Sequence, residues 1–292
     1  EFRRVLFRSL HYNRRMTDTY AVIGNPIAHS KSPEIHAAFA RATSHDIVYK
    51  RIFCELGQLA ETVRAFQAEG GKGLNVTVPF KHEAFEFATR TSERAREAGA
   101  VNVLKFGGAA RGAEVLGDNT DGVGLTRDIT VNLGRELRGK SILLLGAGGA
   151  SFGVVGPLLD EVPRTMVIAN RTLSKAEALA QRFAARYGPC ALSACGYDAL
   201  SGSAFDVVIN ATSAGLSGGM PALPEAIFAP GALAYDMVYD KATPFMQYAQ
   251  ARGATVADGL GMLVEQAAES FLIWRGVRPA TAPVMAALRG AR

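Results

Sequence analysis

The segment NVTVPFK, which ends at Lys81, combines polar side chains that can bind a small molecule with a lysine that can exchange a proton. Because side chains alternate between the two faces of a strand, Asn75 and Thr77 are expected on one face, with their apolar neighbours, including Val78, in the core. Pro79 cannot continue the strand and is favoured where a helix begins. Lys81 would then lie in the first helical turn, where the peptide dipoles disfavour an ammonium ion and ease proton release. Such a lysine suits general acid and base chemistry.

A second polar run, GDNTDG at residues 117–122, supplies a carboxylate for the same lysine. Asp121 beside Lys81 would hold the ammonium ion in place, tune its proton affinity and bind substrate hydroxyls. Two simpler interpretations stay open: Lys81 as a solvated lysine after a buried strand, and GDNTDG as a turn. The run also matches a fragment of a calcium-binding loop, but it lacks the other alternating ligands and the closing glutamate.

Length and composition predict a soluble, globular chain with two domain cores. The chain has 292 residues, of which 48% are hydrophobic and 20% are charged, and it has no disordered signature. The formal net charge is +5, but five arginines and one acid among residues 1–15 account for four of these charges. The excess positive charge therefore lies mainly in this tail and not on a binding face, so no nucleic-acid partner is expected.

Residues 1–16 are interpreted as a non-native or disordered leader, because arginines interrupt every apolar run that a signal peptide would need. No segment approaches the roughly 18 consecutive apolar residues of a membrane span, so no membrane partner is expected. The histidines show no metal-ligand spacing, and a metal site is not expected. An odd number of cysteines without a CxxC pair favours a reduced, cytoplasmic setting. These cysteines are Cys54, Cys190 and Cys195.

Apolar patterns predict an α/β chain with two sheets and hence two domains. Strands and helices alternate from residue 20 in the rhythm of a parallel sheet, and a second series of strands starts near residue 140. We expect the join near residues 118–127, as a linking helix. The strand segments are 20–24, 47–53, 73–78, 141–149, 165–171, 205–215 and 233–239, and the helices are 33–42, 59–69 and, as the last one, 260–274.

A glycine-rich turn in SILLLGAGGASFG follows an apolar strand and precedes an expected helix. Gly146, Gly148 and Gly149 would let the backbone turn tightly and approach a pyrophosphate, whose charge is met by N–H groups at the helix start. Ser151 stands at the third glycine position of GxGxxG and Gly153 follows, so helix and strand are expected to pack slightly further apart. A tight turn without a ligand is the simpler alternative.

The segment NRTLSK after the next strand favours NADP over NAD. At the place where NAD-binding chains carry an acid for the ribose 2′-hydroxyl, this chain has Asn170, Arg171 and Thr172. Arg171 can pair with a 2′-phosphate, to which Asn170 and Thr172 can donate hydrogen bonds and Lys175 can add a positive charge. The alternative is a helix N-cap at Thr172 with basic residues in a solvated first turn, which does not explain the missing acid.

Two serines precede Pro33, a residue type favoured at the first helical position. Ser32 is therefore expected to be the N-cap of a helix, and capping alone is one complete explanation for it. Ser30 needs another role. Two hydroxyls beside a helix N-terminus suit a carboxylate, so we expect the first domain to hold a small organic acid.

The chain contains, in order across nearly all of residues 17–292, the segments GNPIAHSKSP, GLNVTVPFK, AGAVNVL, GDNTDG, GAGGAS, NRT, INATSAG, YDMVY and DGLGMLVEQAA. Together they resemble the shikimate dehydrogenase family, which reversibly reduces 3-dehydroshikimate to shikimate with NADPH. The resemblance implies an α/β substrate domain of residues 17–117 with 259–292 and a Rossmann-like NADP-binding domain of residues 118–258. It also implies a cleft between them and a C-terminal helix that returns to the first domain.

The resemblance further implies roles for the residues that match the family's motifs. Lys81, paired with Asp121, would give a proton to the ketone oxygen as hydride arrives and take it back in reverse. Four residues would hold the substrate carboxylate: Ser30, Ser32, Thr77 and Tyr239. Ring hydroxyls would be bound by Asn75, Asn102, Asp121 and Gln266. NADP would be bound by Gly146, Ala147, Gly148, Gly149, Ala150, Asn170, Arg171, Thr172, Lys175, Met237 and Gly259.

Several alternatives stay open at this point. Without the resemblance, Met237 and Gly259 would be explained by core filling and by a turn. Lys175 stands where relatives often carry arginine, which weakens the expected preference for NADP. A quinate/shikimate dehydrogenase with relaxed cofactor use is the first rival, and a non-catalytic NADP-binding regulatory module is the second. The sequence leaves both a monomer and a homodimer possible.

Overall fold

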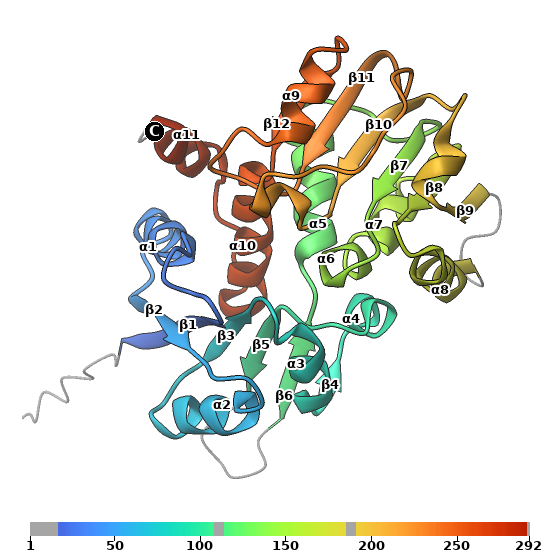
Figure 1. The fold of residues 1–292 in the computed structure, drawn as a ribbon. Helices are drawn as coiled ribbons and strands as arrows, with labels where there is room; N and C mark the ends of the chain where they lie inside the picture. Colours follow the sequence, from blue (N-terminus) through green and yellow to red (C-terminus); the bar gives the residue numbers. More distant parts are fainter. Residues whose placement is uncertain (1–16, 108–113, 185–190, 291–292) are drawn as a thin grey trace, which may run out of the picture.

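The structure is a computed structural model that describes residues 17–107, 114–184 and 191–290. The expected leader, residues 1–16, and Cys190 lie outside the described residues. The described part of the chain forms two six-stranded sheets flanked by helices (Figure 1), so the expected α/β architecture with two sheets is confirmed. None of the helices in these ranges is both long and apolar enough to cross a membrane.

The first sheet has the strand order β2-β1-β3-β5-β6-β4 and is mixed. β1 runs parallel to β2 and β3, whereas β5 is antiparallel to both β3 and β6. The predicted parallel arrangement is confirmed for β1, β2 and β3, whose segments were expected as strands. The antiparallel strand β5 was not expected, and its connection to β6 is shorter than the crossover of about a dozen residues that parallel neighbours need. The strands of this sheet are β1 Asp18–Gly24, β2 Ile47–Phe53, β3 Gly73–Val76, β4 Arg90–Thr91, β5 Val103–Phe106 and β6 Val115–Asp118.

The second sheet has the order β12-β11-β10-β7-β8-β9, and all neighbouring strands are parallel. Numbered from β7, this is the order 3-2-1-4-5-6 of dinucleotide-binding folds, whose ligands bind at the carboxyl ends of the strands where the order reverses. Here that point lies between β7 and β10. The strands are β7 Ser141–Leu145, β8 Thr165–Ala169, β9 Ala191–Cys195, β10 Phe205–Asn210, β11 Phe228–Asp236 and β12 Thr255–Asp258.

The apolar run of β7 explains its place in the middle of this sheet. Ile142 and Leu144 pack into one apolar cluster, and Leu143 and Leu145 pack into another on the opposite face. A strand covered on both faces needs a continuous apolar run, which SILLL provides. The helices of the chain are α1 Ser32–Ala42, α2 Leu59–Ala68, α3 Lys81–Phe87, α4 Glu93–Ala98, α5 Asp121–Arg127, α6 Gly149–Phe152, α7 Val155–Asp160, α8 Leu173–Ala184, α9 Pro244–Gln250, α10 Leu260–Arg275 and α11 Ala282–Gly290.

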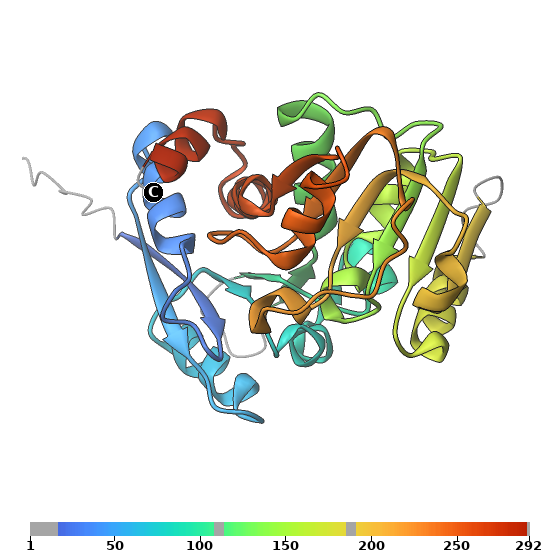
Figure 2. The ribbon, with the colours of Figure 1, turned by 45° about the horizontal axis from the view of Figure 1, so that its top comes forward.

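Helix α10 returns to the first sheet, as expected (Figures 1 and 2). Its Trp274 donates from Nε1 to the carbonyl oxygen of Leu104 on β5 over 3.0 Å and stacks on Tyr20 of β1, with ring centroids 4.6 Å apart. Phe271 packs with Phe39 of α1 in an apolar cluster. The prediction that α10 is the last helix is wrong, because α11 follows it and packs against α1 and α10.

Helix α5 packs against α10 and against α7, so it connects the parts of the molecule built on the two sheets. It lies in the expected linking segment and continues into a π-helical turn over Asp128–Asn132. At Gly124 the helices α5 and α10 approach closely. A Cβ at this position would lie 2.8 Å from the carbonyl oxygen of Met262 and 2.9 Å from the backbone nitrogen of Gln266.

Replacement of Gly124 by alanine is expected to lower the free energy of unfolding by about 1–3 kcal/mol, because backbone atoms of α10 cannot move aside as a flexible side chain would. Urea unfolding measures this change. Gly290→Ala is the matched control, since no atom lies within 4 Å of its added Cβ. Equal stability of the two variants would contradict the close packing of α5 on α10.

Candidate active site

Lys81 and Asp121 meet as expected: Nζ of Lys81 lies 2.6 Å from Oδ2 of Asp121. Each begins a helix, Lys81 on α3 and Asp121 on α5, so the expected place of the lysine in a first helical turn is confirmed. The side chains are 18% and 9% exposed, which makes this a largely buried ion pair that retains access to solvent. The interpretation of Lys81 as a freely solvated lysine does not fit this geometry.

The second carboxylate oxygen of Asp121 accepts a hydrogen bond from Nδ2 of Asn102 over 2.7 Å. The other Nδ2 proton of Asn102 goes to Oγ1 of Thr120, and Oδ1 of Asn102 accepts from the backbone N–H and the hydroxyl of Thr120. Both protons and both lone pairs of the Asn102 amide are therefore engaged within the chain. Asn102 fixes the direction in which Asp121 points.

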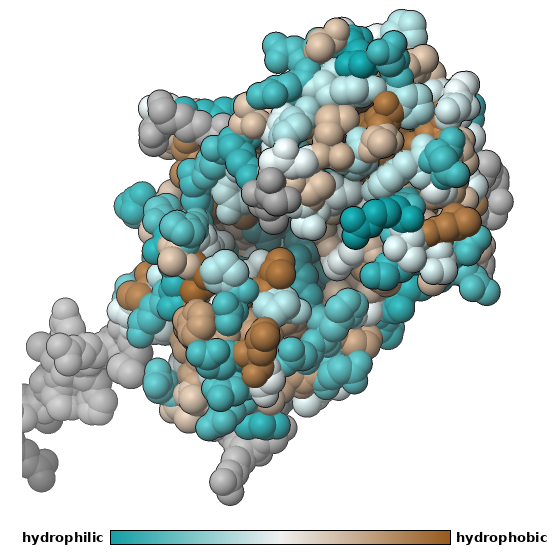
Figure 3. Space-filling view, in the orientation of Figure 1, coloured by the Kyte–Doolittle hydropathy of each residue, from teal (hydrophilic) through white to brown (hydrophobic). Residues whose placement is uncertain are grey.

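A cavity of about 140 Å³ lies at this pair. All residues expected to contact substrate line it, together with Met237 and Gly259 from the expected cofactor set. The space-filling view shows a hollow between the part built on the first sheet and the part built on the second (Figure 3). The expected residues in the wall are Ser30, Ser32, Asn75, Thr77, Lys81, Asn102, Asp121, Tyr239 and Gln266.

Ser30 and Ser32 lie together, with their hydroxyl oxygens 3.2 Å apart. The prediction that Ser32 is the N-cap of α1 is wrong: the helix begins at Ser32, Lys31 occupies the cap position, and no side chain caps the helix. Both serine hydroxyls therefore remain at the cavity wall. Lys31 forms an ion pair with Asp240, the residue after Tyr239, with Nζ 2.7 Å from Oδ2.

Tyr239 closes this end of the cavity as a neutral hydroxyl. Burial, and to a lesser degree the neighbouring Asp240 carboxylate, raise the pKa of Tyr239 above its ordinary value of 10.0. The hydroxyl therefore keeps its proton at neutral pH and can donate a hydrogen bond to an anion. A third hydroxyl, from the other part of the chain, thus complements the serine pair.

The strand that carries Asn75 is shorter than expected. β3 ends at Val76, so Thr77 lies beyond the strand, and Val78 is 65% exposed and not in the core. The period-two expectation fails here because Pro79 lacks an N–H and the chain leaves the sheet before it. Asn75 and Thr77 nevertheless both face the cavity, as does Val76.

The glycine turn lies at the point where the order of the second sheet reverses. Gly146 follows β7 with φ +104°, a backbone conformation that residues with a Cβ rarely adopt. The space beside Gly148 and Gly149 is open, with no atom within 4 Å of an added Cβ. Ser151 is fully buried and its hydroxyl donates to the carbonyl oxygen of Gly146 over 2.8 Å, so serine at the third glycine position ties the turn together.

The NRTLSK segment adjoins this turn. Oδ1 of Asn170 accepts from the backbone N–H of Ala147 over 3.3 Å, and its Nδ2 donates to the carbonyl oxygen of Thr172. Arg171, Thr172 and Lys175 are exposed, and α8 begins directly after Thr172. An open glycine backbone beside two exposed cations, without a carboxylate from 170 to 175, fits a dinucleotide with a 2′-phosphate.

The glycine turn and the ion pair belong to neighbouring elements. Phe152 of α6 meets His82, the residue after Lys81, edge to face at 5.8 Å between ring centroids. Helix α7 packs against α5, which begins at Asp121. A ligand on the glycine turn would therefore lie beside the cavity that holds the ion pair.

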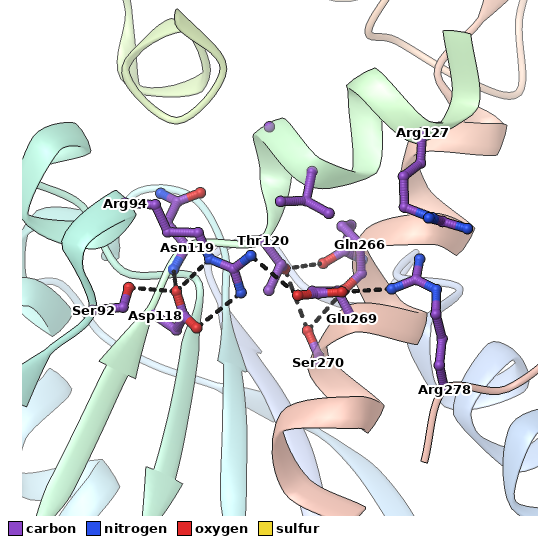
Figure 4. A network of polar contacts seen from close by, with 12 residues as sticks. Ser92, Arg94, Asp118, Asn119, Thr120, Arg127, Gln266, Glu269, Ser270 and Arg278 are labelled. Atoms are coloured by element: carbon purple, nitrogen blue, oxygen red, sulfur yellow. Dashed lines mark hydrogen bonds and ion pairs between the residues drawn. The ribbon is translucent and has the colours of Figure 1, made fainter. Parts of the chain in front are cut away.

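A network of buried and half-buried polar and charged side chains surrounds the segment that leads to Asp121; Figure 4 shows its members from Arg94 to Arg278. Arg94 of α4 binds both carboxylate oxygens of Asp118, at 2.7 and 2.9 Å, and reaches Glu269 of α10 at 3.1 Å. Arg278 then binds Glu269 and Glu265, at 2.5 and 2.6 Å. Asp118 also accepts from the backbone N–H of residue 119, so the run that ends at Asp121 is anchored at its start.

Sequence reasoning missed most of this support. The charged chain joins residues far apart in sequence, and no local pattern marks Arg94 or Glu269. The apolar cavity residues Val22, Met262 and Leu263 were also missed, because they are indistinguishable from core residues in their segments. Tyr49 and Ser270, which bind Asn75, had no motif signal either.

A parallel sheet of this order, with an open glycine turn where the order reverses, places the chain in the class of dinucleotide-binding α/β proteins. The lysine–carboxylate cavity beside that turn suits an oxidoreductase of this class that acts on a small polar substrate. Comparison with known proteins gives the family within the class.

Three family models match: "Shikimate dehydrogenase substrate binding domain" over residues 22–104, "Shikimate / quinate 5-dehydrogenase" over 129–217 and "Shikimate 5'-dehydrogenase C-terminal domain" over 259–289. The shikimate dehydrogenase (NADP(+)) of Alkalilimnicola ehrlichii is 58% identical over 94% of this chain and 99% of that protein. The chain belongs to the shikimate dehydrogenase family, and the resemblance in its motifs is confirmed.

Solved structures with the same fold include two of high similarity. The structure of an Ael1 enzyme from Pseudomonas putida has a TM-score of 0.86 and 48% identity, covering 93% of this chain and 98% of that one. Shikimate 5-dehydrogenase from Thermus thermophilus in complex with NADP(H) and shikimate has a TM-score of 0.82 and 30% identity, covering 94% of this chain and 100% of that one.

Glu265 at the end of the charged chain predicts how stability depends on pH. Burial opposes its ionisation, but hydrogen bonds from Thr281, Arg278, Asn132 and Arg127 outweigh burial and lower the pKa of Glu265 below its ordinary value of 4.5. Its ionised form therefore stabilises the fold above pH 4.5, and this contribution is lost as the pH falls through the lowered folded value.

Glu265→Gln is expected to lower the free energy of unfolding at neutral pH by about 2 kcal/mol, and the difference from the wild type should shrink in acid below the ordinary glutamate range. Urea unfolding at fixed ionic strength over a pH series measures both effects. Glu225→Gln is the control, because the Glu225 side chain is 92% exposed and should contribute little. A difference that persists unchanged in acid would contradict the assignment.

Proposed function

We propose that this chain catalyses the reversible NADPH-dependent reduction of 3-dehydroshikimate to shikimate. The observation that carries the proposal is the contact of Lys81 with Asp121, 2.6 Å long, in a cavity also lined by the serine pair. Membership of the shikimate dehydrogenase family supports it, as does the name NADP(+) carried by the relative from Alkalilimnicola ehrlichii. The substrate is a small carboxylic acid with ring hydroxyls.

In this proposal the substrate carboxylate lies between the two parts of the chain. Ser30 and Ser32 donate to it from the first part, with Thr77, and Tyr239 donates from the second. The 3.2 Å separation of the two serine oxygens allows both to reach one carboxylate. Asp121, Gln266 and Asn75 face the ring hydroxyls. Asn102 was also expected among these residues, but its amide is engaged within the chain, so we propose that it acts by holding Asp121.

Lys81 and Asp121 are the proposed catalytic residues. Bound NADPH supplies a hydride to the ketone carbon. Lys81 donates a proton to the ketone oxygen, so that the ketone becomes an alcohol, and it takes the proton back in the oxidation of shikimate. Asp121 holds the amine in reach of that oxygen and compensates its positive charge.

The cofactor is proposed to lie along the carboxyl end of the second sheet. The backbone of Gly146, Ala147, Gly148, Gly149 and Ala150 faces the pyrophosphate, and Arg171 and Lys175 face the 2′-phosphate with Asn170 and Thr172 beside them. Met237 and Gly259, which line the same cavity as Lys81, lie at the nicotinamide. Reactants held across one cleft in this way are aligned before chemistry begins.

We keep three expectations within the proposal. Residues 17–117 with 259–292 form the substrate domain and 118–258 the NADP-binding domain, a boundary that falls at the end of β6. The enzyme works in the cytoplasm, in line with free cysteines at positions 54 and 195. It is a monomer or a homodimer that needs neither nucleic acid nor a membrane.

Lys81→Ala is expected to lower kcat by about 10²–10⁴-fold, the usual contribution of a general acid or base, with a much smaller loss of shikimate binding. Steady-state oxidation of shikimate and calorimetric binding give the two quantities. Lys50→Ala, which removes an exposed lysine of β2, is the control and should leave both unchanged. An unchanged kcat in Lys81→Ala would refute the catalytic role.

Values of kcat/KM for shikimate and quinate, each with NADP and NAD, separate the proposed enzyme from its rivals. We expect shikimate with NADP to give the highest value, and Arg171→Ala to lower the NADP value by about 10- to 100-fold through the loss of charge-assisted hydrogen bonds. The NAD value should not change. Arg90→Ala, in the first sheet, is the control. Equal use of NAD would favour the relaxed quinate/shikimate enzyme, and absence of any turnover would favour a regulatory module.

A further inference from the structure

Asn75 lies in the cavity wall with its amide held by three groups of the chain. Nδ2 donates to the carbonyl oxygen of Asn102 over 3.2 Å and to the hydroxyl of Ser270 over 2.9 Å. Oδ1 accepts from the hydroxyl of Tyr49 over 2.7 Å. The side chain is 6% exposed, so these contacts replace nearly all of its hydration.

The chemistry of its partners fixes which way this amide points. A backbone carbonyl can only accept, so the atom of Asn75 that faces Asn102 must be the nitrogen. Ser270 gives its own proton to the carbonyl oxygen of Gln266 over 2.9 Å, so it too accepts from Asn75. Both amide protons are thereby used, and the oxygen that accepts from Tyr49 has a second lone pair, in a residue that lines the cavity.

Tyr49 is itself held in a fixed orientation. Its ring stacks on His36 with centroids 4.2 Å apart and planes 6° from parallel. His36 is fully buried, burial lowers its pKa to about 3 against the opposing effect of Asn75, and it therefore stacks as a neutral ring. Burial likewise raises the pKa of Tyr49 well above 10.0, against the effect of Ser32, so the hydroxyl keeps the proton that it donates.

We propose that Tyr49 is a positioning residue that fixes Asn75 as a hydrogen-bond acceptor toward the substrate, so that the site selects a ring hydroxyl able to donate. The inference rests on the proposed function and deepens it, since Tyr49 does not line the cavity and acts through Asn75. Without the Tyr49 hydroxyl, Oδ1 of Asn75 loses this hydrogen bond, and the amide is held through its nitrogen by Asn102 and Ser270, so its oxygen is placed less precisely toward a ligand.

Tyr49→Phe tests this, because it removes one hydroxyl and keeps the ring stacked on His36. We expect KM for shikimate to rise about 3- to 10-fold, the effect of one neutral hydrogen bond, with kcat and the KM for NADP within about twofold of the wild type. Tyr20→Phe is the matched control. Tyr20 belongs to the same aromatic cluster, stacks on Trp274 and uses its hydroxyl for Arg275, away from the cavity.

A double-mutant cycle separates action through Asn75 from general loosening of the fold. Asn75→Ala should raise KM, and adding Tyr49→Phe to it should cause no further rise. In Tyr49→Phe alone, the discrimination against the shikimate analogue that lacks the hydroxyl bound by Asn75 should also shrink relative to the wild type.

Three outcomes would overturn the inference: an unchanged KM in Tyr49→Phe, equal effects in Tyr20→Phe, or a KM effect that adds in full to that of Asn75→Ala. The wild type is measured first. If it does not turn over shikimate with NADP, the proposed function fails and the inference fails with it, whereas normal wild-type turnover with an unchanged Tyr49→Phe defeats the inference alone.

Discussion

The surrounding structure holds Lys81 and Asp121 in contact, and the proposed chemistry depends on this contact. The two residues come from different helices, α3 and α5, and meet only because β5 lies antiparallel between β3 and β6. That arrangement brings the carboxyl ends of β3 and β6 to the same edge of the sheet. A buried ammonium and carboxylate at 2.6 Å are stable there because each compensates the charge of the other and Asn102 satisfies the second oxygen.

Several polar and charged side chains are buried at this edge of the sheet. Each needs a hydrogen-bond or ion-pair partner, and the chain of charges that starts at Asp118 provides such partners. Asp118 is 8% exposed, and Arg94 meets both of its oxygens. From there, alternating charges lead through Glu269 and Arg278 to Glu265, which also accepts from Arg127 on α5. Asp121 begins α5 and Arg127 ends it, so both ends of this helix are fixed. A helix held at both ends can present its first carboxylate in one direction.

The sequence predicted the elements that are marked by a periodicity or motif within one segment. It did not predict the features that depend on contacts between distant segments. β2 and the apolar run of β7 were read correctly because their periodicity lies within one segment, and Lys81 and Asp121 because their motifs do. The antiparallel β5 and the charged pair of Arg94 with Glu269 depend on which segments meet in space. Ser32 was misread as a cap because its neighbours fit a cap, while Lys31 takes that position. Motif matching found the polar cavity residues but neither the apolar ones nor the partners that orient the polar side chains.

Cavity residues of the same type differ in how many of their hydrogen-bond donors and acceptors are already used within the chain. Asn75 and Asn102 are the same residue type in one wall, yet Asn102 has every donor and acceptor engaged, whereas Asn75 keeps one acceptor. Donors gather where the serine pair and Tyr239 lie, and acceptors gather at Asn75 and Asp121. A ligand with a carboxylate at one end and hydroxyls at the other therefore matches the cavity in a single orientation. Specificity in this site depends on the second layer of contacts that fixes each amide and carboxylate.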